Sequence, residues 1–269
     1  MGQQFNVMRI TTSDGTYAHG AHMTDAPRPC NPHLDLVGFK YPFPRLTDSL
    51  KRQRKIRIVA IGSSSTAGEG NIVPFPFRLE LALRNRYPGR MIDVVNRGIS
   101  GQEAPEELSR FESDVIAEAP TLAIWQVGTN AIFHRDLYDP HAVAGTIATG
   151  VSLLKSLLTD VILMDLQFAP ALLEDNQGHK DPAKEKDTRL MVSLISAVAK
   201  GAEVNLFPRF ALMESWCVED GLSLADLTNP TDPKRLHMSE WATQCVTTAL
   251  DRAIGLAVGP VPGAPPPTV

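Results

Sequence analysis

Residues 58–70 read "IVAIGSSSTAGEG", an apolar run that ends at a glycine followed by three consecutive serines. Isoleucine and valine favour strands, and an apolar run without alternating polar residues is typical of a strand that is covered on both faces. The glycine indicates a tight turn, which would leave the serines in the loop beyond the strand. The stretch therefore predicts a buried parallel strand followed by a polar loop at its carboxyl end.

The same alternation of apolar and helix-like segments continues along the chain. Expected strands cover residues 56–62, 91–98, 121–128, 161–168 and 204–210, and the expected helices that follow them cover 77–87, 105–119, 142–158, 187–200 and 239–254. Repeated strand and helix units favour a parallel sheet with helices on both faces. We predict a three-layer α/β/α sandwich with a five-stranded, mostly parallel sheet.

Four regions are expected along the chain. Residues 1–23 have no periodic pattern and end in "GAHM", which is typical of a vector-derived leader. Residues 24–54 are rich in proline and are predicted to form an extended arm packed on the domain. The domain itself is expected at residues 55–256, and residues 257–269 form a proline-rich segment that predicts a disordered tail.

Composition narrows the class of partner. The net charge is −4, from 26 basic and 30 acidic residues, which favours neither nucleic acid nor an acidic membrane surface. No apolar run approaches the roughly 18 to 20 residues of a membrane span, so no integral membrane segment is expected. Cys30, Cys217 and Cys245 lie too far apart for a metal or redox motif. The expected partner is a small molecule.

The serine loop departs from three common glycine-containing motifs. A phosphate loop would need a lysine that is absent, and a dinucleotide-binding loop would need its second glycine sooner after the strand. The G-x-S-x-G turn of α/β hydrolases also fails, because Thr66 stands where its second glycine would be. A serine nucleophile on a different α/β scaffold remains.

Further polar groups follow the other expected strands, and the carboxyl ends of parallel strands meet at one edge of a sheet. The segment "NRGISGQEA" at 96–104 brings glycine to that edge. In "WQVGTNAIF", the side-chain amide of Asn130 can donate to a developing oxyanion. In "NPTDPKRLHMSEWA", His237 stands just before a helix that Ser239 can cap. Serine, glycine, asparagine and histidine therefore fall on the same edge.

This order of residues resembles the SGNH hydrolases, also called the GDSL esterase family, over residues 56–255. The blocks "GSSSTAGEG", "NRGISGQEA", "WQVGTNA", "MDLQFAP" and "LHMSEWA" look like those of a bacterial, mostly exported subgroup whose first block reads GSSSTAG. The resemblance implies a flavodoxin-like sandwich and a serine esterase that hydrolyses carboxylic esters through an acyl-serine intermediate.

The resemblance also implies the roles of individual residues. It places the nucleophile at Ser64 and the general base at His237. The implied oxyanion donors are the backbone N–H groups of Ser64 and Gly101 and the side-chain amide of Asn130. Because a serine hydroxyl alone is a weak nucleophile, the histidine must accept its proton and later return one to the leaving group. This chemistry requires no metal and no cofactor.

The acid of the expected triad departs from the family pattern. Most members carry an aspartate three residues before the histidine, but Lys234 holds that position here. Asp232 is the nearest carboxylate and Asp226 is the next, and Pro233 allows the bend that either would need. We predict Asp232 as the acid, with Asp226, or a dyad of Ser64 and His237 alone, as the alternatives.

Three side chains beside these blocks are candidates for contacts with substrate. His134 and Arg135 follow the Asn130 block, where a solvated loop is the alternative, and Gln167 lies in "MDLQFAP". Members of the subgroup carry cysteines in similar places, so the resemblance further implies a disulfide between Cys30 and Cys245.

The usual export of the subgroup implies a periplasmic or secreted protein, with a cytoplasmic location as the alternative. It also implies short acyl groups, such as acetyl, on a saccharide. Lipid or thioester acyl groups are a second possibility. From a different class, a binding module could hold an ester or sugar without turnover, and Lys234 in the acid position favours that alternative.

Overall fold

The apolar run at residues 58–61 lies in an interior strand of the sheet. It belongs to β1 (Lys55–Gly62), which pairs with β2 (Met91–Gly98) on one side and β3 (Leu122–Gln126) on the other. Beyond β3 follow β4 (Asp160–Met164) and β5 (Asn205–Phe207), so the order is β2-β1-β3-β4-β5. All four pairings are parallel in this computed structural model, which describes residues 28–261.

Successive side chains of β1 enter two different hydrophobic cores. Ile58 and Ala60 belong to the core on one face of the sheet, whereas Val59 and Ile61 belong to the core on the other, and all four are fully buried. Because both faces are covered at residues 58–61, this part of the strand is apolar throughout, whereas the charged Lys55 and Arg57 stand at its partly exposed beginning. The predicted α/β/α sandwich is confirmed, and the five-stranded sheet is parallel throughout.

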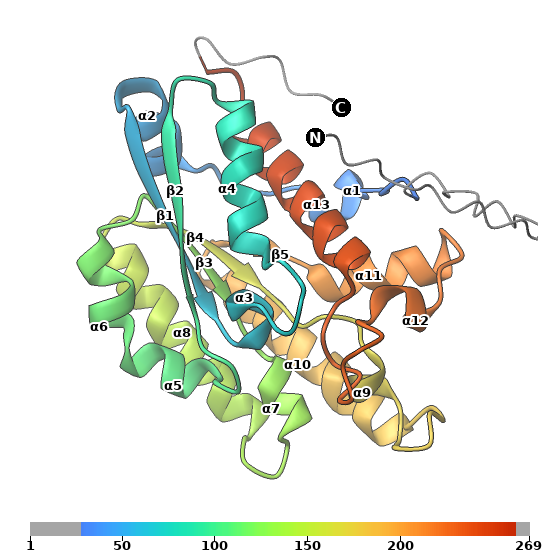
Figure 1. The fold of residues 1–269 in the computed structure, drawn as a ribbon. Coiled ribbons are helices and arrows are strands. Elements are labelled where there is room, and N and C mark those ends of the chain that lie inside the picture. Colours follow the sequence, from blue (N-terminus) through green and yellow to red (C-terminus); the bar gives the residue numbers. More distant parts are fainter. Residues whose placement is uncertain (1–27, 262–269) are drawn as a thin grey trace, which may run out of the picture.

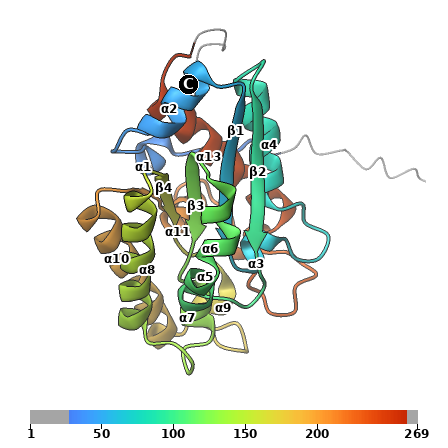
Figure 2. The same cartoon turned by 90° about the vertical axis from the view of Figure 1, so that its left-hand side faces the viewer.

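The helices divide between the two faces (Figures 1 and 2). One core is closed by α1 (Leu34–Val37), α2 (Pro44–Arg52), α4 (Phe75–Arg86), α11 (Arg209–Val218), α12 (Leu224–Leu227) and α13 (Glu240–Val258). The other is closed by α5 (Ala104–Ser109), α6 (Phe111–Asp114), α7 (Thr129–Phe133), α8 (Pro140–Ser156), α9 (Pro170–Leu173) and α10 (Pro182–Gly201). The short α3 (Ser64–Ala67) follows β1 directly, and a 3-10 turn (Ile116–Glu118) precedes β3. Figure 1 shows α3 and α7 at the end of the sheet where β1 finishes.

The segment before the sheet is partly helical, so the prediction of an extended arm is wrong for residues 44–52. Proline at the first position of α2 costs nothing, because the first N–H groups of a helix have no intrahelical partner. Leu46 and Leu50, one turn apart, are both buried in the core. The prolines before residue 44 obscured this short amphipathic pattern.

The expected ends of the chain lie largely beyond the described residues. The expected leader at residues 1–23 falls outside them, as do residues 262–269 of the expected tail. The last helix runs on to Val258, two residues past the expected domain end, and Val261 is still buried. Among the helices within residues 28–261, none has the length and apolar character that a bilayer crossing requires.

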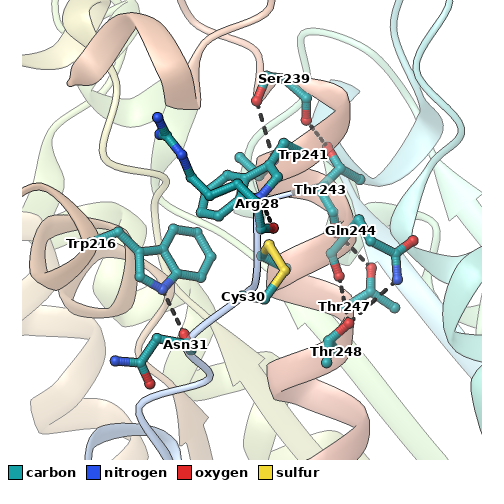
Figure 3. Close-up of a disulfide and its surroundings, with 12 residues drawn as sticks. Arg28, Cys30, Asn31, Trp216, Ser239, Trp241, Thr243, Gln244, Thr247 and Thr248 are labelled. Atoms are coloured by element: carbon teal, nitrogen blue, oxygen red, sulfur yellow. Dashed lines mark hydrogen bonds between the residues drawn. A yellow bond between two sulfur atoms is a disulfide. The ribbon is translucent and has the colours of Figure 1, made fainter. Parts of the chain in front are cut away.

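A disulfide joins the start of the described chain to the last helix (Figure 3). It links Cys30 to Cys245 in α13, with 5.4 Å between the two Cα atoms and a sequence separation of 215 residues. Two tryptophans hold the same segment: Trp216 Nε1 donates to the Asn31 carbonyl at 2.7 Å, and Trp241 Nε1 donates to the Arg28 carbonyl at 2.9 Å. The implied disulfide is therefore present.

Loss of this disulfide should lower thermal stability strongly. In the chain-entropy account a cross-link over a loop of this length contributes about 5 kcal/mol. The Tm of the double variant Cys30→Ser, Cys245→Ser should therefore fall by roughly 10 °C, measured by calorimetry on oxidised protein. The matched control is Cys217→Ser, which removes the partly exposed free thiol. Equal Tm values for the unsubstituted protein, the double variant and the control would contradict the expectation.

Candidate active site

Ser64 lies at the carboxyl end of β1, as the first residue of α3. The turn that places it there depends on Gly62: a Cβ at this position would stand 2.5 Å from Thr66 Oγ1 and 2.9 Å from Gln126 Oε1. Both distances are shorter than van der Waals contact allows, so only glycine fits. Ser64 itself is almost buried, with 5% of its surface exposed.

A buried amide holds the serine turn from the neighbouring strand. Gln126, at the end of β3, uses its single Oε1 to accept from the Ser63 N–H at 3.1 Å, the Ser63 hydroxyl at 3.1 Å and the Thr66 hydroxyl at 3.2 Å. Sequence reasoning missed this residue. The available signal was a polar side chain inside an apolar strand, because such a group needs a partner.

His237 faces Ser64 across the loop before α13. Its Nε2 lies 2.9 Å from Ser64 Oγ, and its Nδ1 lies 2.8 Å from Asp232 Oδ2. The imidazole is largely buried, with 7% of the residue exposed. When Nδ1 carries its proton toward the carboxylate, Nε2 is free to accept the serine proton. The three side chains therefore form one continuous hydrogen-bonded chain.

The carboxylate of Asp232 is fixed by the backbone of its own loop. The N–H groups of Leu236 and His237 donate to Oδ2, each at 2.8 Å, and the Lys234 N–H donates to Oδ1 at 3.0 Å. Burial raises the pKa of Asp232, but these backbone donors outweigh it and the net shift is downward. Asp232 therefore remains ionised beside the imidazole.

Asp226, the alternative acid, makes different contacts. Its Oδ2 accepts from the N–H and hydroxyl of Ser223 at the start of α12, and its Oδ1 lies 3.7 Å from an Arg28 guanidinium nitrogen. These bonds form a capping box, with the Ser223 hydroxyl accepting from the Asp226 N–H. The side chain of Asp226 thus caps a helix, and it is Asp232 that meets the histidine.

Gly101 and Asn130 lie in the loops that follow β2 and β3. Gly101 has a φ of +82°, a conformation that favours glycine, and within the described residues its N–H donates to no protein group. Asn130, in the first turn of α7, donates one amide hydrogen to the Gln102 carbonyl at 2.8 Å, which leaves its second hydrogen for another acceptor. Ser64 adds the N–H of a first helical residue, which has no partner within its helix.

Glu103 fastens these two loops together and was also missed by sequence reasoning. Its carboxylate is buried and accepts the N–H groups of Gly128 and Ala131, both at 2.8 Å. Burial raises its pKa, while the backbone donors act in the opposite direction. The residue lies two positions after Gly101 and binds on both sides of Asn130, so it fixes the two loops relative to each other.

A small open hollow lies beside the serine. It is lined by Ser64 and His237 together with Glu69, Ile72 and Pro74, among others. Its walls come from the loop after α3 and from the start of α13. A group that reaches the serine hydroxyl from solvent must therefore be small or must enter end-on.

The three candidates for substrate contacts lie elsewhere. His134 and Arg135 are exposed and do not line the hollow, and an Arg135 guanidinium nitrogen lies 3.6 Å from Asp187 Oδ2. Gln167 is fully buried, and its amide is hydrogen-bonded to protein groups, including the Leu236 carbonyl. The prediction that Gln167 contacts substrate is therefore wrong, because the residue has no accessible surface.

Comparison with known proteins gives the family. The model of the non-GDSL lipase-like family matches residues 29–259, which is most of the chain. The chain belongs to this family. A search of curated proteins finds no match. The first block of this non-GDSL lipase-like protein accordingly reads GSSS, with no GDSL motif in the serine loop.

Solved structures share the fold of this family member. An acetylxylan esterase, Axe2 from Geobacillus stearothermophilus, superposes with a TM-score of 0.60 at 23% identity, covering 74% of this chain and 94% of its own. LAE5, an α/β hydrolase from the metagenome of Lake Arreo in Spain, gives a TM-score of 0.61 at 21% identity, with 75% and 96% covered. At these identities the likeness establishes the architecture.

Replacing Gln126 should loosen the serine turn of this non-GDSL lipase-like protein. In Gln126→Leu, three donors lose their acceptor, two of them side-chain hydroxyls in a buried turn. Unfolding in urea should show a loss of at least about 2 kcal/mol, because each unsatisfied buried donor costs about 1–3 kcal/mol. The control is Gln244→Leu, at an exposed amide that accepts one hydrogen bond from Arg78. Equal losses in the two variants would contradict the role assigned to Gln126.

Proposed function

We propose that the protein is a serine ester hydrolase that works through an acyl-serine intermediate. The observation that carries the proposal is the hydrogen-bonded chain from Ser64 Oγ to His237 Nε2, and from His237 Nδ1 to Asp232 Oδ2, at 2.9 and 2.8 Å. A nucleophile within reach of a base that is itself oriented by a carboxylate is the arrangement that acyl transfer requires.

In the first step, Ser64 Oγ attacks the ester carbonyl carbon while its proton passes to His237 Nε2. The imidazole becomes an imidazolium, which the ionised Asp232 stabilises through the Nδ1 hydrogen bond. The low pKa of Asp232 supports this role, because the carboxylate keeps its negative charge instead of taking the proton.

The carbonyl oxygen becomes an oxyanion as the tetrahedral intermediate forms. We assign its stabilisation to the N–H groups of Ser64 and Gly101 and to the second amide hydrogen of Asn130. Precedent from another serine hydrolase gives about 10²- to 10³-fold in rate for one such donor. Glu103 supports the assignment, because it fixes the loops that carry two of the three donors.

The intermediate then collapses. His237 returns the proton to the leaving alcohol oxygen, the carbon–oxygen bond of the ester breaks, and the acyl group remains on Ser64. Water next attacks the acyl carbon, gives its proton to His237, and the carboxylic acid leaves as the proton returns to Ser64. The chain's own residues supply every proton transfer of this cycle.

The proposed substrate is a saccharide that carries short acyl groups such as acetyl. The small hollow beside Ser64 supports a short acyl group. The structural neighbour Axe2 is an acetylxylan esterase, and its solved catalytic mutants replace a serine, a histidine and an aspartate. The same three residue types meet here at Ser64, His237 and Asp232.

Two alternatives receive less support. Lipid or thioester acyl groups would call for a larger apolar hollow than the one beside Ser64. A binding module without turnover was favoured by Lys234 in the position of the acid, but that residue only donates its backbone N–H to Asp232, which meets the histidine instead.

The disulfide supports an exported protein. Disulfides persist in oxidising compartments such as the periplasm and the extracellular space, and are rare in the cytosol. We therefore propose that the protein works outside the cytoplasm, where acylated envelope or extracellular saccharides would be accessible.

A panel of p-nitrophenyl esters of rising chain length tests the proposed function. We expect kcat/KM to be highest for acetate and to fall as the acyl chain lengthens beyond what the hollow admits. Ser64→Ala should reduce hydrolysis by at least about 10³-fold, as expected when a catalytic nucleophile is removed. The exposed Ser196→Ala serves as control.

A fluorophosphonate should label Ser64 alone, as peptide mass spectrometry would show. Labelling that survives Ser64→Ala, or that maps to Ser63 or Ser65, would refute the assignment of the nucleophile. If none of the esters is hydrolysed, the proposal that the protein is an ester hydrolase is refuted.

The acid can be tested by comparing two aspartates in one loop region. Asp232→Asn should lower kcat by at least roughly tenfold with KM little changed, because the charge stabilises the imidazolium formed in the transition state. Asp226→Asn should leave kcat nearly unchanged, since its carboxylate caps α12. Steady-state kinetics below the unfolding temperature measures kcat for both variants. If Asp226→Asn lowered kcat more than Asp232→Asn, Asp226 would be the acid.

A further inference from the structure

Gln167 lies beneath the active site, after β4, and every polar atom of its side chain is used. Its Oε1 accepts from the Thr129 hydroxyl at 3.0 Å, the Ser65 hydroxyl at 3.4 Å and the Arg209 guanidinium Nη2 at 2.8 Å. Its Nε2 donates to the Leu236 carbonyl at 3.2 Å. The residue is fully buried and touches no solvent.

Three of these partners are direct chain neighbours of the proposed catalytic groups. Ser65 follows Ser64, Thr129 precedes Asn130, and Leu236 precedes His237. One amide therefore contacts three segments together: the one that carries Ser64, the one that carries Asn130 and the one that carries His237. We propose that Gln167 is a positioning residue that sets the relative placement of these three loops and thereby the rate of the chemical step.

Arg209 determines which way this amide points. The guanidinium is fully buried, and it donates from Nε to the Asp165 carbonyl at 3.0 Å and from Nη2 to Gln167 Oε1 at 2.8 Å. Burial lowers its pKa to about 10, so it still carries its charge at neutral pH and can only donate. The amide oxygen must therefore face Arg209, and the amide nitrogen must face the Leu236 carbonyl.

The arrangement has a direct consequence for catalysis. Proton transfer needs Ser64 Oγ within hydrogen-bond reach of His237 Nε2, and the oxyanion needs the Asn130 amide at similar range. A displacement of about 1 Å between catalytic groups can cost on the order of 10²-fold in rate. Because Gln167 lies under the loops and contacts no substrate, its loss should act on kcat and leave KM unchanged.

This inference rests on the proposed function and is tested with the same esters. We expect Gln167→Leu to lower kcat for p-nitrophenyl acetate at least roughly tenfold while KM changes less than about twofold, and to slow fluorophosphonate labelling of Ser64 to a similar degree. All rates are measured below the unfolding temperature of each variant. Thr129→Val removes only the Thr129 hydroxyl. This hydroxyl donates to Gln167 Oε1 at 3.0 Å and accepts a longer hydrogen bond, of 3.5 Å, from Gln126 Nε2.

A double-mutant cycle then separates positioning from general loss of stability. If Thr129 acts through Gln167, Thr129→Val should lower kcat in the native background and have little further effect in Gln167→Leu. The matched control is Thr188→Val, at another fully buried threonine, whose hydroxyl donates to the Leu172 carbonyl at 2.8 Å and makes no hydrogen bond to Gln167. The control should lower Tm and leave kcat unchanged.

Several outcomes would overturn the positioning role. It fails if the active, folded Gln167→Leu protein keeps the native kcat, or if Thr129→Val has the same effect on kcat in both backgrounds. Should Gln167→Leu not fold, Thr129→Val and Ser65→Ala each remove one contact, and a kcat equal to that of Thr188→Val would refute the role. Absence of hydrolysis and labelling in the unsubstituted protein would instead refute the proposed function.

Discussion

The contact between His237 Nε2 and Ser64 Oγ joins groups 173 residues apart in the sequence. The contact therefore depends on how segments from opposite ends of the domain are placed relative to each other. The parallel sheet supplies the coarse placement, since its strands all end at the same edge. The fine placement comes from buried polar side chains at that edge, of which Gln126, Glu103 and Gln167 are the clearest.

These supports share a chemical pattern. Each is a buried amide or carboxylate that accepts from two or more donors, which include backbone N–H groups for Gln126 and Glu103 and are side-chain groups from three different segments for Gln167. Burying such a group is costly unless its hydrogen bonds are made, so the side chain and the loop conformation require each other. The edge of the sheet thus keeps its shape through hydrogen bonds between buried polar groups, while the two hydrophobic cores hold the layers together.

Local sequence signals were sufficient for the layers and for the loops that gather at the edge, whereas the individual roles of Ser64, Gly101 and Asn130 came from the family resemblance. The unbroken apolar run at residues 58–61 indicated a doubly covered strand, and glycine, asparagine and histidine stood at strand ends, where parallel topology brings them together. Asp232 was predicted from proximity alone, and the backbone bonds that fold its loop explain why a spacing of five residues works as well as three. Helix α2 was missed because prolines, which begin helices as readily as they prevent them, dominated the preceding segment.

Gln126 gave one such signal, as a polar side chain within an apolar strand, but the supporting role of Gln167 could not have been assigned in this way. Gln167 stood beside a strand end like the others, and sequence alone does not give the depth of a side chain. Its partner Arg209 lies 42 positions further on, at the start of α11, and nothing in the sequence of that helix indicates that the arginine is buried. Such residues are identified by what surrounds them in space, and that information becomes available only when the packing of distant segments is known.

The disulfide between Cys30 and Cys245 makes a closed covalent ring of most of the chain. Ser64, Asp232 and His237 all lie inside that ring. A single cut in any surface loop between the two cysteines would leave both fragments covalently attached, with nucleophile and base still in one molecule. Cleavage of the backbone and separation of the resulting parts are therefore two different events for this chain.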